Sequence, residues 1–253
     1  MLRHAIAASA LAAAVLLTPT AAFAKTHGGG GGGSPSPTGY DVSYPQCGTA
    51  LPTGQTFGIV GVNSGIVFSP NPCLSTEYAW AVKSTMSPRV SFYANTADPG
   101  PTSPHWPTGQ AGCPSDTLTT GCSYDYGWNA AADSFQDAVA ASTPAAAQAA
   151  PWWLDVESAN SWQNTPSYNI ADLQGAVAYL QSVGVSTVGI YTNGSSWSSI
   201  TGNSTAFARY PSWVPGARSL RGAESNCTAS ITGGMVTDAQ YPLNGYDADY
   251  RCP

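Results

Sequence analysis

Short runs rich in β-branched and aromatic residues recur along the chain and predict a series of β-strands. Between these runs the chain is rich in Gly, Pro, Asn and Ser, as is typical of strand ends. The predicted strands cover residues 39–44 (GYDVSY), 57–63 (FGIVGVN), 89–95 (RVSFYAN), 151–157 (PWWLDVE), 187–193 (TVGIYTN), 211–216 (PSWVPG), 236–241 (VTDAQY) and 245–250 (GYDADY). Eight strands are the number in a closed α/β barrel, and we therefore expect this fold class.

Apolar residues recur at helical spacing between several of these strands. Helices are predicted over residues 74–83, 129–141 and 170–183. In the last of these, Leu173, Val177 and Leu180 fall on one face, while Asn169 and Gly184 are the expected N-cap and C-terminal stop. The connections after the fifth strand are short and rich in Ser, Gly and Asn, so we expect the last third of the barrel to be irregular.

The beginning of the chain has a different pattern. Residues 1–24 combine a basic start, an apolar run and small residues at Ala22 and Ala24, which is typical of a secretory signal peptide. A membrane anchor is the alternative, but the apolar run is shorter than the roughly 20 residues that span a bilayer. Residues 25–38 have the composition of a Gly/Ser/Pro-rich flexible linker. Residues 39–253 are then one domain, which we expect to be a monomer, secreted and extracellular or associated with the cell wall.

All six cysteines lie in that domain, and an even number in an exported chain predicts disulfides. Six cysteines allow fifteen pairings. Proximity in the chain and the predicted strands favour Cys47 with Cys73, Cys113 with Cys122, and Cys227 with Cys252. The alternative is that the thiols are free and buried.

Charged residues are few and mostly acidic. The domain holds six basic residues against all fourteen acidic residues of the chain. Nucleic acids and anionic membrane surfaces are bound through clusters of positive charge, which this composition does not supply. We therefore expect neither as a partner.

The scarcity of His and Lys also limits the chemistry. Only His105 lies in the domain, so a zinc site built on several histidines is excluded, and we expect no metal and no other cofactor. Lys83, the domain's only lysine, lies on a predicted helix, where a solvated side chain is the ordinary outcome. No Gly-rich loop carries the lysine that a phosphate-binding loop requires.

Carboxylates remain as the reactive groups. Alternate residues of a strand share a face, so Trp153, Asp155 and Glu157 point to one side, toward the barrel interior and its C-terminal mouth. Asp41 and Asp247 occupy similar positions on the first and last predicted strands, which become neighbours when a barrel closes. Burial and mutual repulsion raise the pKa of one carboxyl of such a group, which can then serve as a general acid.

The strand sequences GYDVS, FGIVGVN, VSFYAN, WWLDVE, VGIYTN, SWVPG, AQY and GYDADY resemble those of the lysozymes of glycoside hydrolase family 25. The likeness is closer still to a related domain of secreted actinobacterial proteins. Its most specific element is an Asp on the first strand combined with Asp-x-Glu on the fourth. The resemblance implies an irregular (β/α)5β3 barrel that cleaves the β-1,4 bond after N-acetylmuramic acid in peptidoglycan.

The resemblance also implies roles for individual residues. Glu157 corresponds to the general acid, and Asp155 to a partner that orients the acetamido group of the substrate or acts as nucleophile. Asp41 and Asp247 correspond to supporting acids. Tyr93, Tyr191 and Gln240 fall where the family lines its groove, and the inward-facing Trp153 is expected to join them.

The chain departs from the family after its third strand, at Asn95 and along residues 99–127. This segment carries Trp106 and the predicted Cys113–Cys122 loop. We expect Asn95 and Trp106 to contact substrate and the segment to form one wall of the groove, although a surface decoration is the alternative. For the whole domain, the alternative to a hydrolase is a barrel that binds cell-wall glycan without turnover.

Overall fold

The computed structural model describes residues 37–253. The predicted signal peptide and residues 25–36 of the predicted linker lie outside this part of the chain. The first strand begins at Thr38, one residue before the predicted domain boundary. Within residues 37–253, no helix has both the length and the apolar character needed to cross a bilayer.

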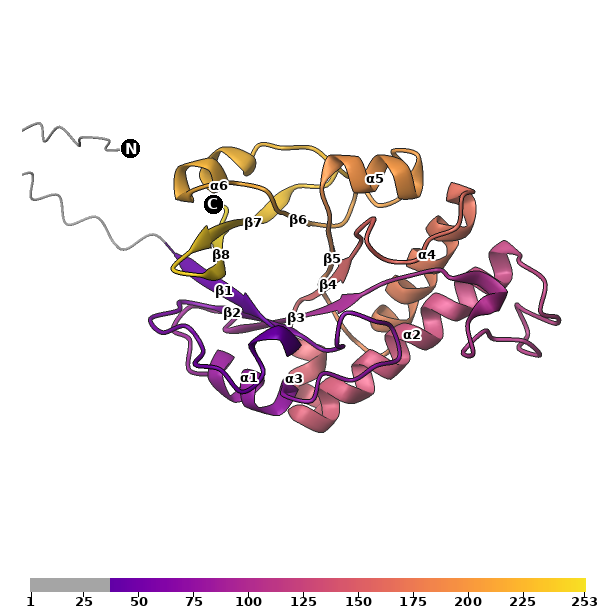
Figure 1. Cartoon of the computed structure of the whole chain (residues 1–253), viewed down its shortest axis with the longest axis horizontal. Coiled ribbons are helices and arrows are strands. Elements are labelled where there is room, and N and C mark those ends of the chain that lie inside the picture. Colours follow the sequence, from indigo (N-terminus) through magenta and orange to yellow (C-terminus); the bar gives the residue numbers. More distant parts are fainter. Residues whose placement is uncertain (1–36) are drawn as a thin grey trace, which may run out of the picture. The chain divides into compact units, whose positions relative to one another are not determined.

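Eight strands close into a barrel in their sequence order, which confirms the predicted fold class (Figure 1). They are β1 Thr38–Val42, β2 Gly58–Gly61, β3 Val90–Asn95, β4 Trp152–Asp155, β5 Val188–Tyr191, β6 Ser212–Val214, β7 Val236–Leu243 and β8 Tyr246–Arg251. Neighbouring strands are parallel from β1 to β7. β8 is antiparallel to both β7 and β1 and closes the barrel.

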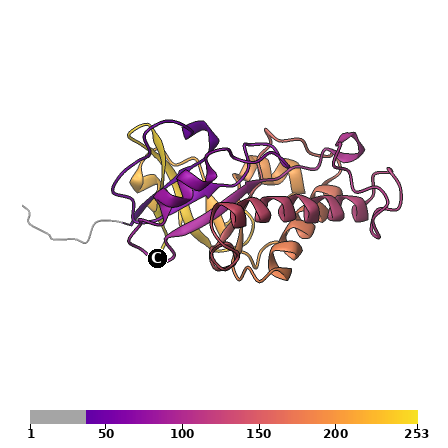
Figure 2. The same ribbon diagram turned by 90° about the horizontal axis from the view of Figure 1, so that it is seen from below.

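Helices lie outside the ring of strands (Figure 1). They are α1 Leu74–Ala81, α2 Thr120–Ala141, α3 Pro144–Ala149, α4 Pro166–Ser182, α5 Gly194–Thr201 and α6 Leu220–Asn226, with short 3-10 turns at Tyr44–Gln46 and Gly100–Thr102. The last two helices have only eight and seven residues, which agrees with the irregular last third expected from the sequence. Figure 2 shows the long α2 from the side, with the preceding chain looped beyond its first turn.

β4 separates two apolar clusters, as its alternating pattern predicts. Trp152 and Leu154 belong to the large cluster shared with the surrounding helices. Trp153 points inward and packs with Phe57 and Trp213 in a small interior cluster. This inner cluster packs inside the barrel, beneath the mouth formed by the C-terminal ends of the parallel strands.

Two helix starts differ from those predicted. α2 begins at Thr120, inside the segment 99–127, because the Thr119 side chain caps it by accepting from the Cys122 amide at 3.1 Å. α4 begins at Pro166, whose ring fixes a helical φ at the first position. Asn169 is therefore not the N-cap. It is fully buried inside the helix, and its amide donates to the carbonyl of Ile200 at 2.9 Å.

The three predicted disulfides are present, and no cysteine in the described chain is free. Cys47–Cys73 joins the loops that follow β1 and β2. Cys113–Cys122 ties the chain before α2 to its first turn. Cys227–Cys252 fixes the residue that follows β8 to the end of α6.

α2 and α4 approach each other at two glycines that the sequence analysis did not single out. A Cβ atom added to Gly127 would lie 2.0 Å from the carbonyl oxygen of Asp172. One added to Gly175 would lie 1.9 Å from the carbonyl oxygen of Tyr124. The two backbones are therefore in direct contact, which holds the N-terminal half of α2 against the barrel.

The first prediction concerns this helix contact. Gly175→Ala forces a methyl group into the backbone of α2 and should lower the free energy of unfolding by about 2–3 kcal/mol. Gly194→Ala is the matched control, because a Cβ there meets no atom within 4 Å and should leave stability within about 0.5 kcal/mol. Urea denaturation measures both. Equal effects of the two substitutions would contradict the close packing of α2 on α4.

Candidate active site

Four acidic side chains meet at a cavity at the C-terminal end of the parallel strands. Asp41 comes from β1, Asp155 ends β4, Glu157 follows it, and Asp247 comes from β8. The cavity has a volume of about 180 Å³ and is lined by Asp41, Tyr93, Asp155, Glu157, Tyr191, Trp213, Gln240 and Asp247. All of these except Trp213 were singled out from the sequence.

The register of the parallel strands brings distant parts of the chain to one level. Asn95 is in register with Asp155, Asp155 with Tyr191, and Tyr191 with Trp213. In a parallel sheet, residues in register point to the same face. These four side chains consequently form one inward-facing row at the mouth of the barrel.

The antiparallel seam supplies the opposite side of the cavity. Asp41 on β1 is directly opposite Asp247 on β8. The Gln240 amide donates to Asp41 Oδ2 at 2.9 Å, and the Tyr191 hydroxyl donates to Gln240 Oε1 at 3.0 Å. This chain of hydrogen bonds crosses the cavity and fixes the orientation of Asp41.

Asp155 is the most deeply enclosed of the four acids, with 4% of its surface exposed. Its Oδ2 accepts from the Asn95 amide at 2.6 Å. Its Oδ1 is buried and has no hydrogen-bond partner within the described chain. One oxygen is thus held in place, while the other is left without a hydrogen-bond partner.

Burial raises the pKa of both carboxyls at the end of β4. The pKa of Asp155 lies well above its ordinary range because of desolvation, with further repulsion from Glu157 and Asp41. The pKa of Glu157 is also raised by desolvation, and its side chain is only half-buried. Repulsion between the two carboxylates raises the pKa of the more enclosed Asp155, whereas the pKa of Glu157 is raised by desolvation alone.

Two further acids, which the sequence analysis did not single out, lie inward on β7 and β8. Asp249 is fully buried and accepts from the Trp213 indole at 2.8 Å, while Asp238 forms an ion pair with Arg251 at 3.0 Å. Desolvation raises the pKa of Asp238 to about 6 despite Arg251, and that of Asp249 well above its ordinary range. The alternation in GYDADY could have identified Asp249 from the sequence, because Asp249 shares a strand face with Asp247.

Three of the predicted substrate contacts lie outside this cavity. Trp153 is buried beneath it, in the interior cluster. The Asn95 amide donates to Asp155, which lines the cavity, and Asn95 itself lines a second pocket. Trp106 lines neither and packs on Tyr126, with their ring centroids 5.7 Å apart.

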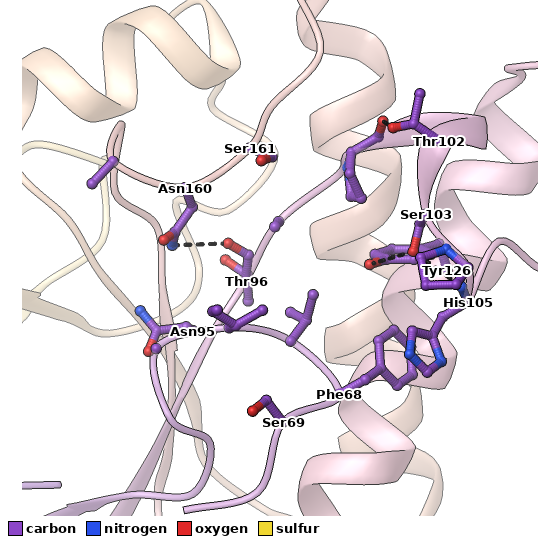
Figure 3. A pocket seen from close by; sticks show the side chains of 17 residues that line it. Phe68, Ser69, Asn95, Thr96, Thr102, Ser103, His105, Tyr126, Asn160 and Ser161 are labelled. Atoms are coloured by element: carbon purple, nitrogen blue, oxygen red, sulfur yellow. Dashed lines mark hydrogen bonds between the residues drawn. The ribbon is translucent and has the colours of Figure 1, made fainter. Parts of the chain in front are cut away.

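The second pocket is larger, with a volume of about 570 Å³, and adjoins the first at Asn95 (Figure 3). Residues 65–69, 99–105 and 159–161 contribute to its walls. Part of the segment 99–127 therefore lines this pocket, and its C-terminal part is the start of α2. That the segment forms a wall of the substrate groove stays a prediction. His105 belongs to this pocket and stacks on Phe68, with ring centroids 4.2 Å apart.

No group of three or more potential metal ligands among residues 37–253 is arranged to hold an ion. Asp41 and Asp155 of the cavity are instead held by the amides of Gln240 and Asn95. Burial raises the pKa values of these carboxyls and therefore favours their protonated form, which can take part in proton transfer.

A family model described as Lysozyme-like protein 1 matches residues 111–216, a stretch that contains Asp155 and Glu157. A curated protein of Dictyostelium discoideum, named Probable GH family 25 lysozyme 4, is 37% identical over 106 residues. The aligned part is 39% of this chain and 47% of that protein. The chain thus spans about half the length of this curated relative.

Two solved structures extend the likeness to nearly the whole described chain. A muramidase from Trichobolus zukalii has a TM-score of 0.56 at 19% identity and covers 85% of this chain and 93% of its own. A modular autolysin of Streptococcus pneumoniae, solved with a synthetic peptidoglycan ligand, has a TM-score of 0.57 at 11% identity, with coverages of 86% and 47%.

At these identities the structural likeness shows the fold, an α/β barrel shared with muramidases. The family model and the curated relative add sequence likeness over the central part of the chain, and together they support a relationship to the lysozymes of glycoside hydrolase family 25. The closer resemblance to an actinobacterial domain stays a prediction.

The second prediction concerns the buried acids. Burial and repulsion from Asp247 raise the pKa of Asp41 to about 7, against the donor Gln240, which lowers it. A carboxyl whose pKa is raised by folding stabilises the protein below its unfolded pKa, and this contribution is lost as the pH rises through the folded pKa. The free energy of unfolding should therefore fall between about pH 4 and about pH 7.

Asp41→Asn should make this decline shallower, because the amide cannot ionise. The exposed Asp116→Asn is the matched control and should leave the decline unchanged. Denaturation curves across the pH range test the prediction. Stability that increases with pH over this window would contradict it.

Proposed function

We propose that this protein is a secreted glycoside hydrolase acting on cell-wall glycan, most specifically on a β-1,4 bond of the peptidoglycan type. One observation carries the proposal. Asp155 and Glu157 stand two residues apart at the end of β4, at the same cavity, but differ in enclosure and in hydrogen bonding. Glycoside hydrolysis requires two carboxyl groups in unlike environments.

Glu157 acts as the general acid. Its raised pKa keeps a proton on the carboxyl at mildly acidic pH, and its half-exposed position lets it reach a bound chain. The proton passes to the glycosidic oxygen as the bond from that oxygen to the anomeric carbon breaks. The resulting carboxylate then takes a proton from the water that completes hydrolysis.

Asp155 assists at the anomeric side. Its partnered Oδ2 is fixed by Asn95, and its unpartnered Oδ1 can accept from the acetamido N–H of an N-acetylated sugar. This contact would orient the acetamido oxygen toward the anomeric carbon, where it forms the transient bond of substrate-assisted catalysis. Direct attack by Asp155 is the other route that two carboxyls allow.

Asp41 and Asp247 line the opposite side of the cavity, where their carboxyl groups can form hydrogen bonds with the sugar. Tyr93, Tyr191 and Gln240 offer hydroxyl and amide groups to the ring hydroxyls. The rigid hydrogen bonds from Tyr191 to Gln240 and from Gln240 to Asp41 favour this role, because their geometry exists before substrate arrives.

The names of similar proteins agree with this substrate class. The curated relative is named a lysozyme, the fungal structure is a muramidase, and the autolysin was solved with a peptidoglycan ligand. Three disulfides fit an oxidising compartment outside the cytoplasm, and the predicted signal peptide would provide the route there.

The third prediction tests the two carboxyls. Glu157→Gln should lower the rate of release of reducing ends from purified cell walls about a thousandfold, because no proton reaches the leaving group. Asp155→Asn should also lower it, while the exposed Glu224→Gln is a control that should change nothing. Mass spectrometry of the soluble products identifies the bond that is cleaved.

The same experiment distinguishes a glycan hydrolase from a barrel that binds glycan without turnover. If the wild type releases no product from any wall preparation, the hydrolase proposal fails. Retention on insoluble walls that survives Glu157→Gln, again without product, would instead identify a glycan-binding barrel.

The fourth prediction concerns pH. Because desolvation raises the pKa of Glu157, the active protonated form should persist above the ordinary titration range of a glutamate and then disappear as the pH increases. Activity should therefore peak on the acid side of neutrality. A pH–rate profile for kcat/KM measures this, and a rate that continues to rise into the alkaline range would exclude Glu157 as the acid.

A further inference from the structure

The larger pocket at the barrel mouth has no role in the proton chemistry described above. Its volume of about 570 Å³ falls within the range of about 300–1,000 Å³ typical of small-molecule sites. Figure 3 shows Asn95, Thr96 and Asn160 on one side of this space, and Phe68, His105, Tyr126 and Ser103 on the other.

One wall is a short loop that presents apolar side chains. Its ends are joined by the bridge between Asn63 and Pro70 and by hydrogen bonds between Ser64 and Ser69, including a hydroxyl pair at 2.7 Å. At its tip, Ile66 lines the pocket with 67% of its surface exposed. Ile66 therefore offers an exposed apolar surface at the rim of the pocket.

Phe68 in the same loop has a strained backbone. Its φ is +59°, a conformation that costs a bulky residue about 1–2 kcal/mol relative to glycine. The ring is held by stacking on His105 and by an edge contact with Tyr126, whose centroid is 5.4 Å away. Glycine would adopt this backbone conformation without strain. The presence of Phe68 therefore indicates a role for its aromatic ring at this wall.

The opposite wall is polar but uncharged. The Asn160 amide donates to the carbonyl of Thr96 at 3.0 Å, and Asn95 joins this wall to Asp155. None of the 17 lining residues is an aspartate, glutamate, lysine or arginine. The pocket is therefore suited to a neutral ligand with hydroxyl or amide groups and one apolar face, rather than to a charged peptide.

We propose that this pocket binds an uncharged sugar residue of the same glycan chain whose bond lies at Glu157. This inference rests on the proposed function, which places the cleaved bond at Glu157. Asn95 lines this pocket and donates to Asp155 of the smaller cavity, so a chain lying across the barrel mouth can reach both. Phe68 and Ile66 contact the apolar side of the sugar, and Asn160 and Ser103 face its hydroxyl groups.

The test compares peptide-free glycan strands of two lengths. A disaccharide spans only the cleaved bond, whereas an octasaccharide can also reach the pocket. Phe68→Gly removes the ring and relieves the backbone strain, so it should lower kcat/KM for the octasaccharide about tenfold and leave that for the disaccharide unchanged. Its melting temperature should not fall.

Ile66→Ser and Met235→Ser form a matched pair. Both remove a large exposed apolar side chain, but Met235, 73% exposed, precedes β7 at the opposite end of the barrel. Only Ile66→Ser should impair cleavage of the octasaccharide. An equal loss with the disaccharide, or no loss with either strand, would overturn the proposal. A loss confined to peptide-bearing glycan would overturn it too, because the pocket would then bind peptide.

If the wild type cleaves neither these strands nor purified cell walls, the proposed hydrolase function fails, and the pocket is tested by binding alone. Calorimetry with the octasaccharide should then give a dissociation constant about tenfold weaker for Phe68→Gly than for the wild type. An unchanged dissociation constant would refute the sugar site independently of catalysis.

Discussion

Closure of the barrel by an antiparallel eighth strand is the constraint on which the candidate site depends. β8 lies between β7 and β1, and this pairing sets Asp41 opposite Asp247 and places Asp238 and Asp249 in the interior. The parallel strands alone would bring Asp41, Asp155 and Glu157 to the mouth, and β8 adds Asp247 opposite Asp41. A shift of β8 by one residue would turn its acids to the other face.

The acids at this seam are held against their own tendency to ionise. Among residues 37–253, the only cation that forms an ion pair with these acids is Arg251, which contacts Asp238. Desolvation therefore dominates and raises the pKa values of the buried carboxyls. The interior cluster of Phe57, Ile59, Trp153 and Trp213 makes this possible, because it excludes water from the barrel floor. Burial of these carboxyls lowers the stability of the fold. It also keeps a carboxyl protonated, and hence able to donate a proton, at mildly acidic pH.

The second pocket depends on packing outside the barrel. Gly127 and Gly175 allow α2 to rest directly on α4, and the second turn of α2 carries Tyr126 to the pocket wall. The Cys113–Cys122 disulfide holds the preceding loop to the first turn of α2. On the same side of the pocket, the loop with Phe68 is tied at its base by Ser64 and Ser69, and the Phe68 ring packs against Tyr126. Segments far apart in the chain thus form one wall beside the acids.

The sequence by itself determined the eight strands, the inward face of β4 and the three disulfides, because each follows from local alternation or from proximity in the chain. It also singled out the acids of β1, β4 and β8, since carboxylates are conspicuous in apolar strands. Only the tertiary structure decided that Trp213 lines the cavity, because a strand of three residues has too short a pattern to define a face. The same holds for Trp106, which packs on Tyr126 while Phe68 and His105 face the pocket: contacts between loops depend on strand register and helix packing, which no local pattern encodes.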